Sequence, residues 1–339
     1  MFNFLRKLFE DDNAGAPSGR VSEKLMHVAI EHVIDATDPR LRLVSHYARK
    51  LTPAVETAVL HVMGIAERLP PARRLDRASF VTDTWVNALF GSADSMQRIV
   101  SLDPQVLAFR ERPEAAGLTQ FYGMLACRRD ERRVLAPARQ GEVIHQDVPR
   151  TQISFSEHAL HELQPVERDA YRGIMRRGYD FLAGCALERI ANLRDQRETL
   201  SERYRLHLGK LQALRRGGHG IGVLDRNEPD AATLAAAEAD LARIERELQD
   251  ATTSLQTLDD YLEQVAHVLS HPADHLWDSS AERRLDRLGV LVEDPTQPGS
   301  TILFNEVSAS EDRRVTFGLV CVPVDELLAR PQLPPDAVF

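Results

Sequence analysis

The chain has 339 residues and a formal net charge of −9, with 42 basic residues, 51 acidic residues and 43% hydrophobic residues. This length and composition predict roughly two or three domains with a buried core, and they exclude a largely disordered chain. The negative charge lies mainly in the C-terminal part, which argues against general affinity for nucleic acid, because phosphate binding needs a clustered basic face. The three cysteines are widely spaced, and neither a signal-peptide pattern nor a long apolar run is found, so we expect a cytoplasmic protein with reduced thiols.

Residues 1–10 predict a short amphipathic helix, and residues 11–19 predict a flexible tether. One side of this helix is apolar, whereas asparagine, arginine, lysine and glutamate lie opposite. Such a helix could contact a membrane surface or a protein partner, or it could fold back on the body of the protein. The residues expected to make this contact are Phe2, Phe4, Leu5, Leu8 and Phe9.

Residues 20–118 predict a helical domain. A capping residue followed by proline, typical of a helix start, occurs at Asp38-Pro39, Thr52-Pro53 and Asp103-Pro104. Another helix is predicted from Arg77 to Phe90, and the next begins at Ser92.

Two groups of short apolar segments, broken by turn residues, predict strands in residues 119–165 and again in residues 279–329. Neither group makes a convincing sheet alone. We therefore expect the two groups to pair in one discontinuous, small α+β domain, followed by an irregular tail over residues 330–339.

Residues 166–278 predict an antiparallel hairpin of two long helices. The glycine-rich residues 217–222 end the first helix. The second helix has leucine at every seventh position, mostly followed three residues later by another apolar residue, as in a coiled coil. Residues 166–216 carry an excess of bases and residues 229–278 an excess of acids, which favours pairing within the chain over a zipper between two chains. The leucines of the expected core are Leu234, Leu241, Leu248, Leu255, Leu262 and Leu269.

The predicted fold is therefore mainly α with a small α+β part. It combines a helical N-terminal domain with an antiparallel coiled-coil hairpin that projects from a short mixed sheet.

Two clusters of histidines and carboxylates flank the base of the predicted hairpin. Residues four apart share a helix face, so Glu263, His267 and His271 could bind a metal ion from one side. His158 and His161 are three apart and lack the HExxH pattern of zinc proteases. These five residues are candidate metal ligands, with the polar outer face of a helix as the alternative, and no cofactor is predicted.

Two other patterns are open to more than one interpretation. The glycine-rich residues 215–222 lack the Gly-Lys-Ser/Thr ending of a phosphate-binding loop, so they favour a hairpin tip. The pairs Arg128-Arg129 and Arg132-Arg133 surround two acids at a predicted turn, which could contact nucleic acid or simply face solvent.

No catalytic motif stands out from the rest of the sequence. We expect a non-enzymatic coiled-coil interaction or scaffold protein with one or more protein partners, peripheral to a membrane or assembly through residues 1–10. The first alternative is a metal-dependent enzyme of unknown reaction at the base of the hairpin, and the second is a nucleic-acid-associated protein. A homo-oligomer is compatible with the same patterns.

Overall fold

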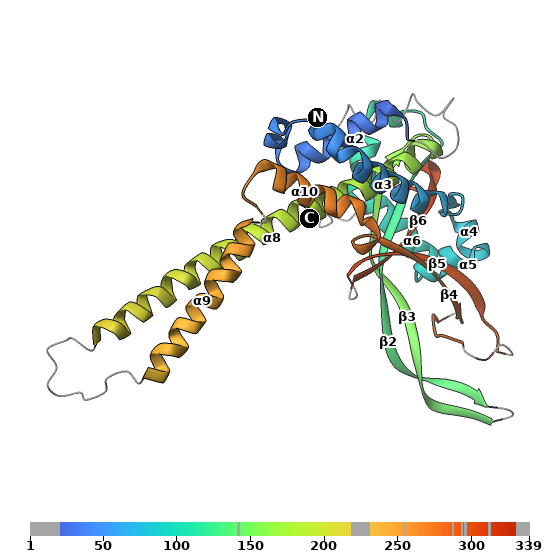
Figure 1. Cartoon of the computed structure of the whole chain (residues 1–339). Coiled ribbons are helices and arrows are strands. Elements are labelled where there is room, and N and C mark those ends of the chain that lie inside the picture. Colours follow the sequence, from blue (N-terminus) through green and yellow to red (C-terminus); the bar gives the residue numbers. More distant parts are fainter. Residues whose placement is uncertain are drawn as a thin grey trace. The chain divides into compact units, whose positions relative to one another are not determined.

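The computed structural model describes residues 21–140, 143–217, 231–253, 255–286, 288–292, 294, 297–310 and 313–329 (Figure 1). These residues divide into two compact units. The sheet unit comprises residues 21–25, 59–179 and 272–329, and the helical unit comprises residues 26–58 and 180–271. The expected contact residues Phe2, Phe4, Leu5, Leu8 and Phe9 and the tail over 330–339 lie outside the described residues.

The described strands of the sheet unit form one six-stranded sheet in the order β3-β2-β6-β5-β4, and β1 pairs in parallel with β6. All other pairings are antiparallel. The two strand groups of the sequence pair through β2 and β6, from Gln120 opposite Pro323 to Arg128 opposite Val315. The strands are β1 (Arg73–Arg74), β2 (Gln120–Gln140), β3 (Val143–Gln164), β4 (Trp277–Leu285), β5 (Ser300–Ser310) and β6 (Arg313–Pro323).

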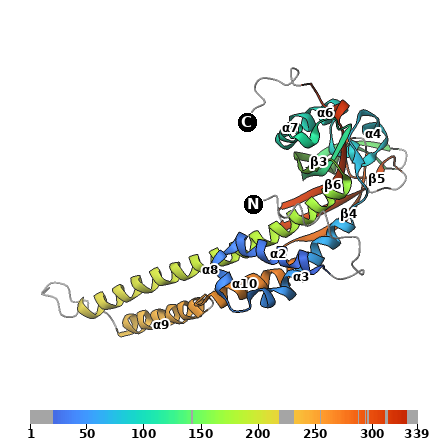
Figure 2. The same ribbon diagram turned by 90° about the horizontal axis from the view of Figure 1, so that it is seen from above.

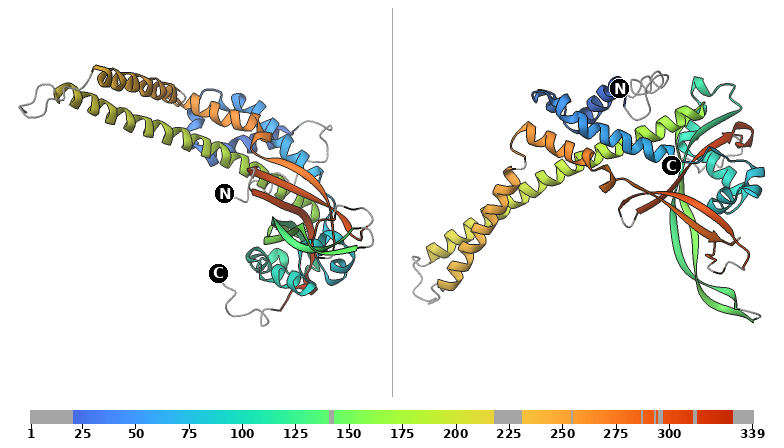
Figure 3. Two further views of the ribbon diagram at one scale, coloured as in Figure 1. Left: turned by 90° about the horizontal axis from the view of Figure 1, so that it is seen from below. Right: turned by 45° about the vertical axis from the view of Figure 1, so that its right-hand side comes forward.

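The segment after β4 connects the two ends of this curled sheet. The Val292 N–H donates to the carbonyl of Arg284 on β4 at 2.8 Å. The Leu291 N–H donates to the carbonyl of Thr151 on β3, also at 2.8 Å, and the Ile153 N–H donates to the carbonyl of Gly289 at 2.8 Å. Residues 289–292 therefore bridge β4 and β3, which we call the closing segment. Beyond it, β2 and β3 continue as a two-stranded ribbon (Figures 1 and 3).

One face of the sheet is packed against short helices and forms the core of the sheet unit. Alternate β2 residues Phe121, Leu125 and Cys127 are buried on this core face, together with Phe304 of β5. Trp85 packs so closely on Gly318 of β6 that an added Cβ would lie 2.8 Å from its ring. The covering helices are α4 (Arg77–Thr82), α5 (Thr84–Leu89), α6 (Ala93–Leu102) and α7 (Pro104–Arg110), and the turn η2 (Pro113–Ala115) follows.

The helical unit contains α2, η1, the first part of α3 up to Ala58, α8 from Asp180 onward, α9 and α10 (Figure 2). Its buried side chains include Ile34, Leu51, Ile190 and Val265. The element bounds are α2 (Glu23–Thr37), η1 (Pro39–Leu43), α3 (Tyr47–Glu67), α8 (Glu167–Gly217), α9 (Ala231–Thr253) and α10 (Leu258–Ser270). The short turns η3 (Pro272–Asp274) and η4 (Val324–Glu326) belong to the sheet unit.

The helix starts predicted from the sequence have different outcomes. Asp103 caps α7 with Pro104 in its first turn, and Ser92 caps α6, so both predictions are confirmed. Asp38 caps only the 3-10 turn η1. The predicted start at Pro53 is wrong, because this proline lies inside α3.

The single helix predicted over 77–90 is also wrong. The carboxylate of Asp83 accepts hydrogen bonds from the Trp85 and Val86 N–H groups and begins the separate helix α5. The stretch therefore contains two short helices, α4 and α5.

The predicted combination of a short mixed sheet and a coiled-coil hairpin is wrong. The sheet is large, since β2 has 21 residues and β3 has 22. The leucine repeat is divided between two helices because Thr257 and Asp260 form a capping box that begins α10. As a result Leu262 and Leu269 are buried in α10, close to η1.

The remaining part of the repeat does not make coiled-coil packing. α9 lies beside the C-terminal part of α8, from residue 201 to Gly217, which we call the outer part of α8 (Figures 1, 2 and 3). The two backbones come close at few positions. On α9 only Ile244 is buried, and Leu234, Leu241 and Leu248 are half-buried. The heptad pattern thus indicated helices correctly but not the surface that covers them. None of the described helices combines the length and apolar character needed to cross a membrane.

Candidate functional site

The core face of the sheet changes from apolar to charged along β2. After buried Cys127, the next side chain on this face is Arg129, whose side chain is only 2% exposed. Its Nη1 lies 2.6 Å from Oε1 of Glu306 on β5, which is also 2% exposed, and its Nη2 lies 3.0 Å from Oε1 of Glu131. The Thr316 hydroxyl donates to Oε1 of Glu306 at 3.5 Å. One buried guanidinium therefore holds two carboxylates from different strands.

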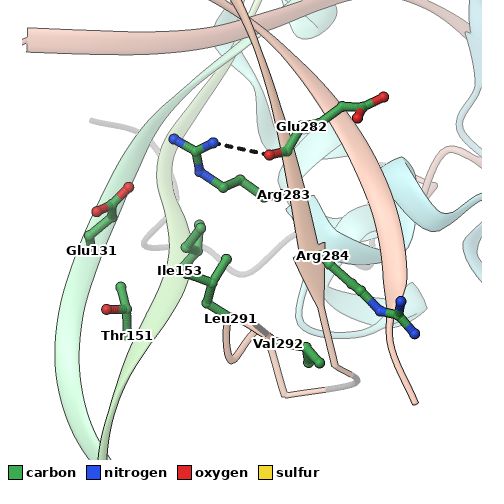
Figure 4. Close-up of a pocket in the computed structure, with 8 residues that line it drawn as sticks. All are labelled: Glu131, Thr151, Ile153, Glu282, Arg283, Arg284, Leu291 and Val292. Carbon is green, nitrogen blue, oxygen red and sulfur yellow. Dashed lines mark hydrogen bonds between the residues drawn. The ribbon is translucent and has the colours of Figure 1, made fainter. Parts of the chain in front are cut away.

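A hollow of about 440 Å³ lies between β2, β3 and β4 (Figure 4). Arg283 reaches from β4 towards β2 and β3, whereas Glu282 and Arg284 point away on the other side of β4 (Figure 4). The Nη1 of Arg283 donates to the carbonyl of Glu282 at 3.0 Å, and no carboxylate of the described chain is paired with it. The lining residues are Glu131, Thr151, Ile153, Glu282, Arg283, Arg284, Leu291 and Val292.

The hollow therefore has one charged group of each sign on opposing strands. Glu131 contributes a half-exposed carboxylate from β2, and Arg283 contributes a guanidinium from β4. Ile153 and Leu291 provide apolar surface near the Arg283 side chain, and Val292 adds to the lining closer to Arg284 (Figure 4). This arrangement can bind a small molecule that carries both charges.

His158 and His161 are held by the core of the sheet unit. The Nε2 of His158 lies 2.8 Å from the carbonyl oxygen of Leu89, and its ring stacks on Phe90 with 4.9 Å between centroids. Burial lowers the pKa of His158. Burial, reinforced by the charge of Arg177, also lowers the pKa of His161. Both rings therefore favour the neutral form, and His158 is positioned to donate its Nε2 proton to a backbone carbonyl.

The other candidate ligands lie in the helical unit. Glu263 and His267 are exposed on α10, and His271 caps its C-terminal end. The His267 and His271 rings are 4.8 Å apart, and Nδ1 of His271 lies 2.9 Å from the carbonyl oxygen of His267. In the part of the chain that the structure describes, no three histidine, cysteine or acidic side chains gather as a metal site.

The three cysteines are free thiols whose ionisation is suppressed. Burial raises the pKa of Cys127 to about 12, and burial also raises the pKa values of Cys185 and Cys321. Because the thiolate is the nucleophile, these cysteines are poor candidates for covalent catalysis.

Among the described residues, no strand pairs with the second edge of β2 beyond its pairing with β6, which ends at Arg128. On β3, the backbone N–H and C=O groups of Thr151 and Ile153 face the closing segment. The backbone groups of Gln152, which lies between them, therefore face β2, where Arg132 is the opposite residue. By the same alternation, the backbone groups of residues 131, 133 and 135 face away from β3. We call residues 129–136 the free edge of β2. Leu135 is 68% exposed on it.

The arginine pairs of the sequence analysis are part of this strand and not of a turn. Arg128 pairs with Asp130 and Glu157 on the surface, whereas Arg129 is buried. Arg132 and Arg133 are exposed. The charged cluster with Glu306 was not predicted, although the alternation of Cys127, Arg129 and Glu131 with period two is a strand signal that could have revealed the shared face.

Comparison of the chain with protein-family models, with curated proteins and with solved structures gives no match. The functional argument therefore rests on the geometry described above.

Proposed function

We propose that the chain is a non-enzymatic interaction protein that binds an extended segment of a protein partner at the free edge of β2. The observation that supports this proposal is that β2 continues to Gln140 after its pairing with β6 ends at Arg128. A strand edge of this kind offers a row of backbone donors and acceptors, and proteins bind extended peptides by adding them as a further strand.

The two edges of the ribbon differ in their capacity to take a strand. The outer edge of β3 already bonds to the closing segment at Thr151 and Ile153, and Pro149 removes an N–H further along. On β2, Pro137 ends the usable stretch, so a partner strand would pair with residues 129–136. An isolated two-stranded ribbon is only marginally stable in water, and a third strand would stabilise it.

The charge of the free edge favours an acidic partner segment. Arg132 and Arg133 are both exposed, and no ion pair with a carboxylate of the described chain engages either of them. Because Arg132 and Arg133 point to opposite faces of β2, acidic side chains at neighbouring positions of an added strand would lie beside these guanidinium groups, one on each face. Each exposed pair would contribute at most about 1 kcal/mol. Backbone hydrogen bonds would supply affinity, and charge would select the partner.

The cytoplasm is the proposed location of this interaction. The free thiols Cys127, Cys185 and Cys321 support it, because unpaired cysteines are typical of a reducing compartment.

The test compares Leu135→Pro with Leu135→Ala in the full chain. Leu135 is exposed and its N–H faces the free edge, so proline removes an outward donor without breaking the pairing with β3, whereas alanine keeps that donor. A partner captured from native cells should be retained by the native chain and Leu135→Ala and lost by Leu135→Pro. Circular dichroism and urea unfolding of both variants control for folding.

Hydrogen exchange on the purified complex identifies the surface involved. The amides of residues 131, 133 and 135 should exchange more slowly in the complex than in the free chain. Retention of the partner by a folded Leu135→Pro variant, or a complex without added protection at these amides, would contradict the proposal.

A further inference from the structure

We infer that the hollow between β2, β3 and β4 binds a small zwitterion of the amino acid or short peptide class, with its ammonium group at Glu131 and its carboxylate at Arg283. This site uses side chains on the core face of the sheet, and it does not depend on a partner strand at the free edge of β2.

The Glu131 end is prepared for a cation. Its carboxylate is oriented by Nη2 of Arg129 at 3.0 Å, but the same guanidinium also neutralises buried Glu306 at 2.6 Å. Two carboxylates thus share one positive charge, which leaves an excess negative charge. Because the Glu131 side chain is 45% exposed and lines the hollow, an ammonium group can reach it.

The Arg283 end is prepared for an anion. Arg283 lies opposite Ile302 in the register of β4 and β5, which places it on the core face. Its hydrogen bond to the Glu282 carbonyl uses one Nη1 donor. A guanidinium has five N–H donors in a planar fork that matches a carboxylate, so bidentate binding of a ligand carboxylate uses donors beyond that bond.

The size and lining of the hollow favour an organic zwitterion over two separate ions. Its volume of about 440 Å³ lies within the usual range of roughly 300–1,000 Å³ for small-molecule sites. Ile153, Leu291 and Val292 can contact an apolar side chain, and Thr151 adds a hydroxyl. A ligand with one charge would leave either the Arg283 guanidinium without an anionic partner or the excess negative charge at Glu131 uncompensated, in a partly desolvated site.

The closing segment makes the site largely pre-formed. Leu291 bonds through its backbone to Thr151, and Val292 bonds to Arg284, so the apolar lining is attached to both walls of the hollow. Less ordering on binding leaves more of the interaction energy available for affinity.

Calorimetry on the full chain tests the inference with four probes. L-leucine and L-leucyl-L-leucine carry both charges, whereas N-acetyl-L-leucine lacks the cation and L-leucinamide lacks the anion. At least one zwitterion should bind, and the singly charged probes should bind at least about tenfold more weakly. Absence of binding by both zwitterions up to about 10 mM, or equal binding of leucine and its singly charged forms, would overturn the inference.

Variants then assign the two ends of the site. Glu131→Gln and Arg283→Gln should each weaken binding of the zwitterion by about tenfold or more. Arg128→Gln is the matched control, because Arg128 is an exposed charge on the same strand that alternates to the opposite face from Glu131. Native affinity in folded Glu131→Gln and Arg283→Gln variants would also overturn the inference. If Arg283→Gln does not fold, Arg283→Lys keeps the charge without the fork and should still bind the zwitterion more weakly.

Discussion

At the residue scale, the buried pair of Arg129 and Glu306 connects the core of the sheet unit to the hollow. Removing two charges from water is costly, and their attraction compensates only when geometry and hydrogen bonding are good. Here the charged atoms of the pair are 2.6 Å apart, Thr316 donates to Glu306, and Arg129 also reaches Glu131 at the surface, although the buried Nη1 of Arg129 makes no hydrogen bond of good geometry within the described chain. The pair therefore fixes the orientation of a carboxylate that lines the hollow.

Glu306→Ala should lower the free energy of unfolding by about 3–5 kcal/mol, because Arg129 would remain buried without its main partner. The double variant Arg129→Met/Glu306→Leu should be considerably more stable than Glu306→Ala, since apolar side chains replace both charges. Urea unfolding measures both values. A single variant within about 1 kcal/mol of the native chain, or a double variant as unstable as the single one, would contradict this prediction.

At the element scale, the closing segment depends on a single glycine. Gly289 has a positive φ of 75°, and an added Cβ would lie 2.6 Å from the carbonyl oxygen of Ile153. A side chain at this position would strain the backbone and push the segment away from β3. Both the positive φ at residue 289 and the close approach of the Ile153 carbonyl oxygen therefore require a glycine at this position.

Gly289→Ala should destabilise the chain by about 1–3 kcal/mol and speed hydrogen exchange at the Ile153 and Leu291 amides. Gly117→Ala is the matched control, because Gly117 has a φ of 76° but nothing within 4 Å of an added Cβ. Denaturant unfolding and hydrogen exchange of the two variants separate the clash from the backbone cost. Equal losses of stability, with unchanged exchange at Ile153 and Leu291, would show that the clash is unimportant.

At the scale of the whole molecule, burial is concentrated in the cores of the two units. Over residues 201–253 only Leu211 and Ile244 are fully buried among the described residues, and Arg215 pairs with Glu238 within the same stretch. By contrast, Ala186 and Ile190 are buried on α8 before residue 201, and Leu262 is buried on α10.

Replacing residues 203–248 by a flexible linker of about ten residues, which spans roughly 18 Å on average, should leave both units folded. The matched control replaces residues 186–262 and removes Ala186, Ile190 and Leu262 from the core, so its helical unit should unfold. Limited proteolysis and thermal unfolding compare the two deletions. Loss of the folded state in the shorter deletion would show that α9 and the outer part of α8 stabilise the rest of the chain.

The sequence by itself determined many of the elements, because capping and periodicity act between neighbouring residues. Ser92 and Asp103 begin helices as predicted, and most of the apolar segments of both strand groups are strands of one sheet. The leucine repeat likewise indicated helices on both sides of residue 254, although the capping box at Thr257 begins a new helix there.

The tertiary structure alone decided which surfaces meet. Nothing local to Arg129 indicates that Glu306 neutralises it, or that Arg283 lies across a hollow from Glu131. Similarly, Leu262 and Leu269 have heptad spacing, yet they are buried in a separate helix near η1. Periodicity shows which side of an element is apolar, but the covering surface is set by contacts between residues far apart in the chain, which no local pattern encodes.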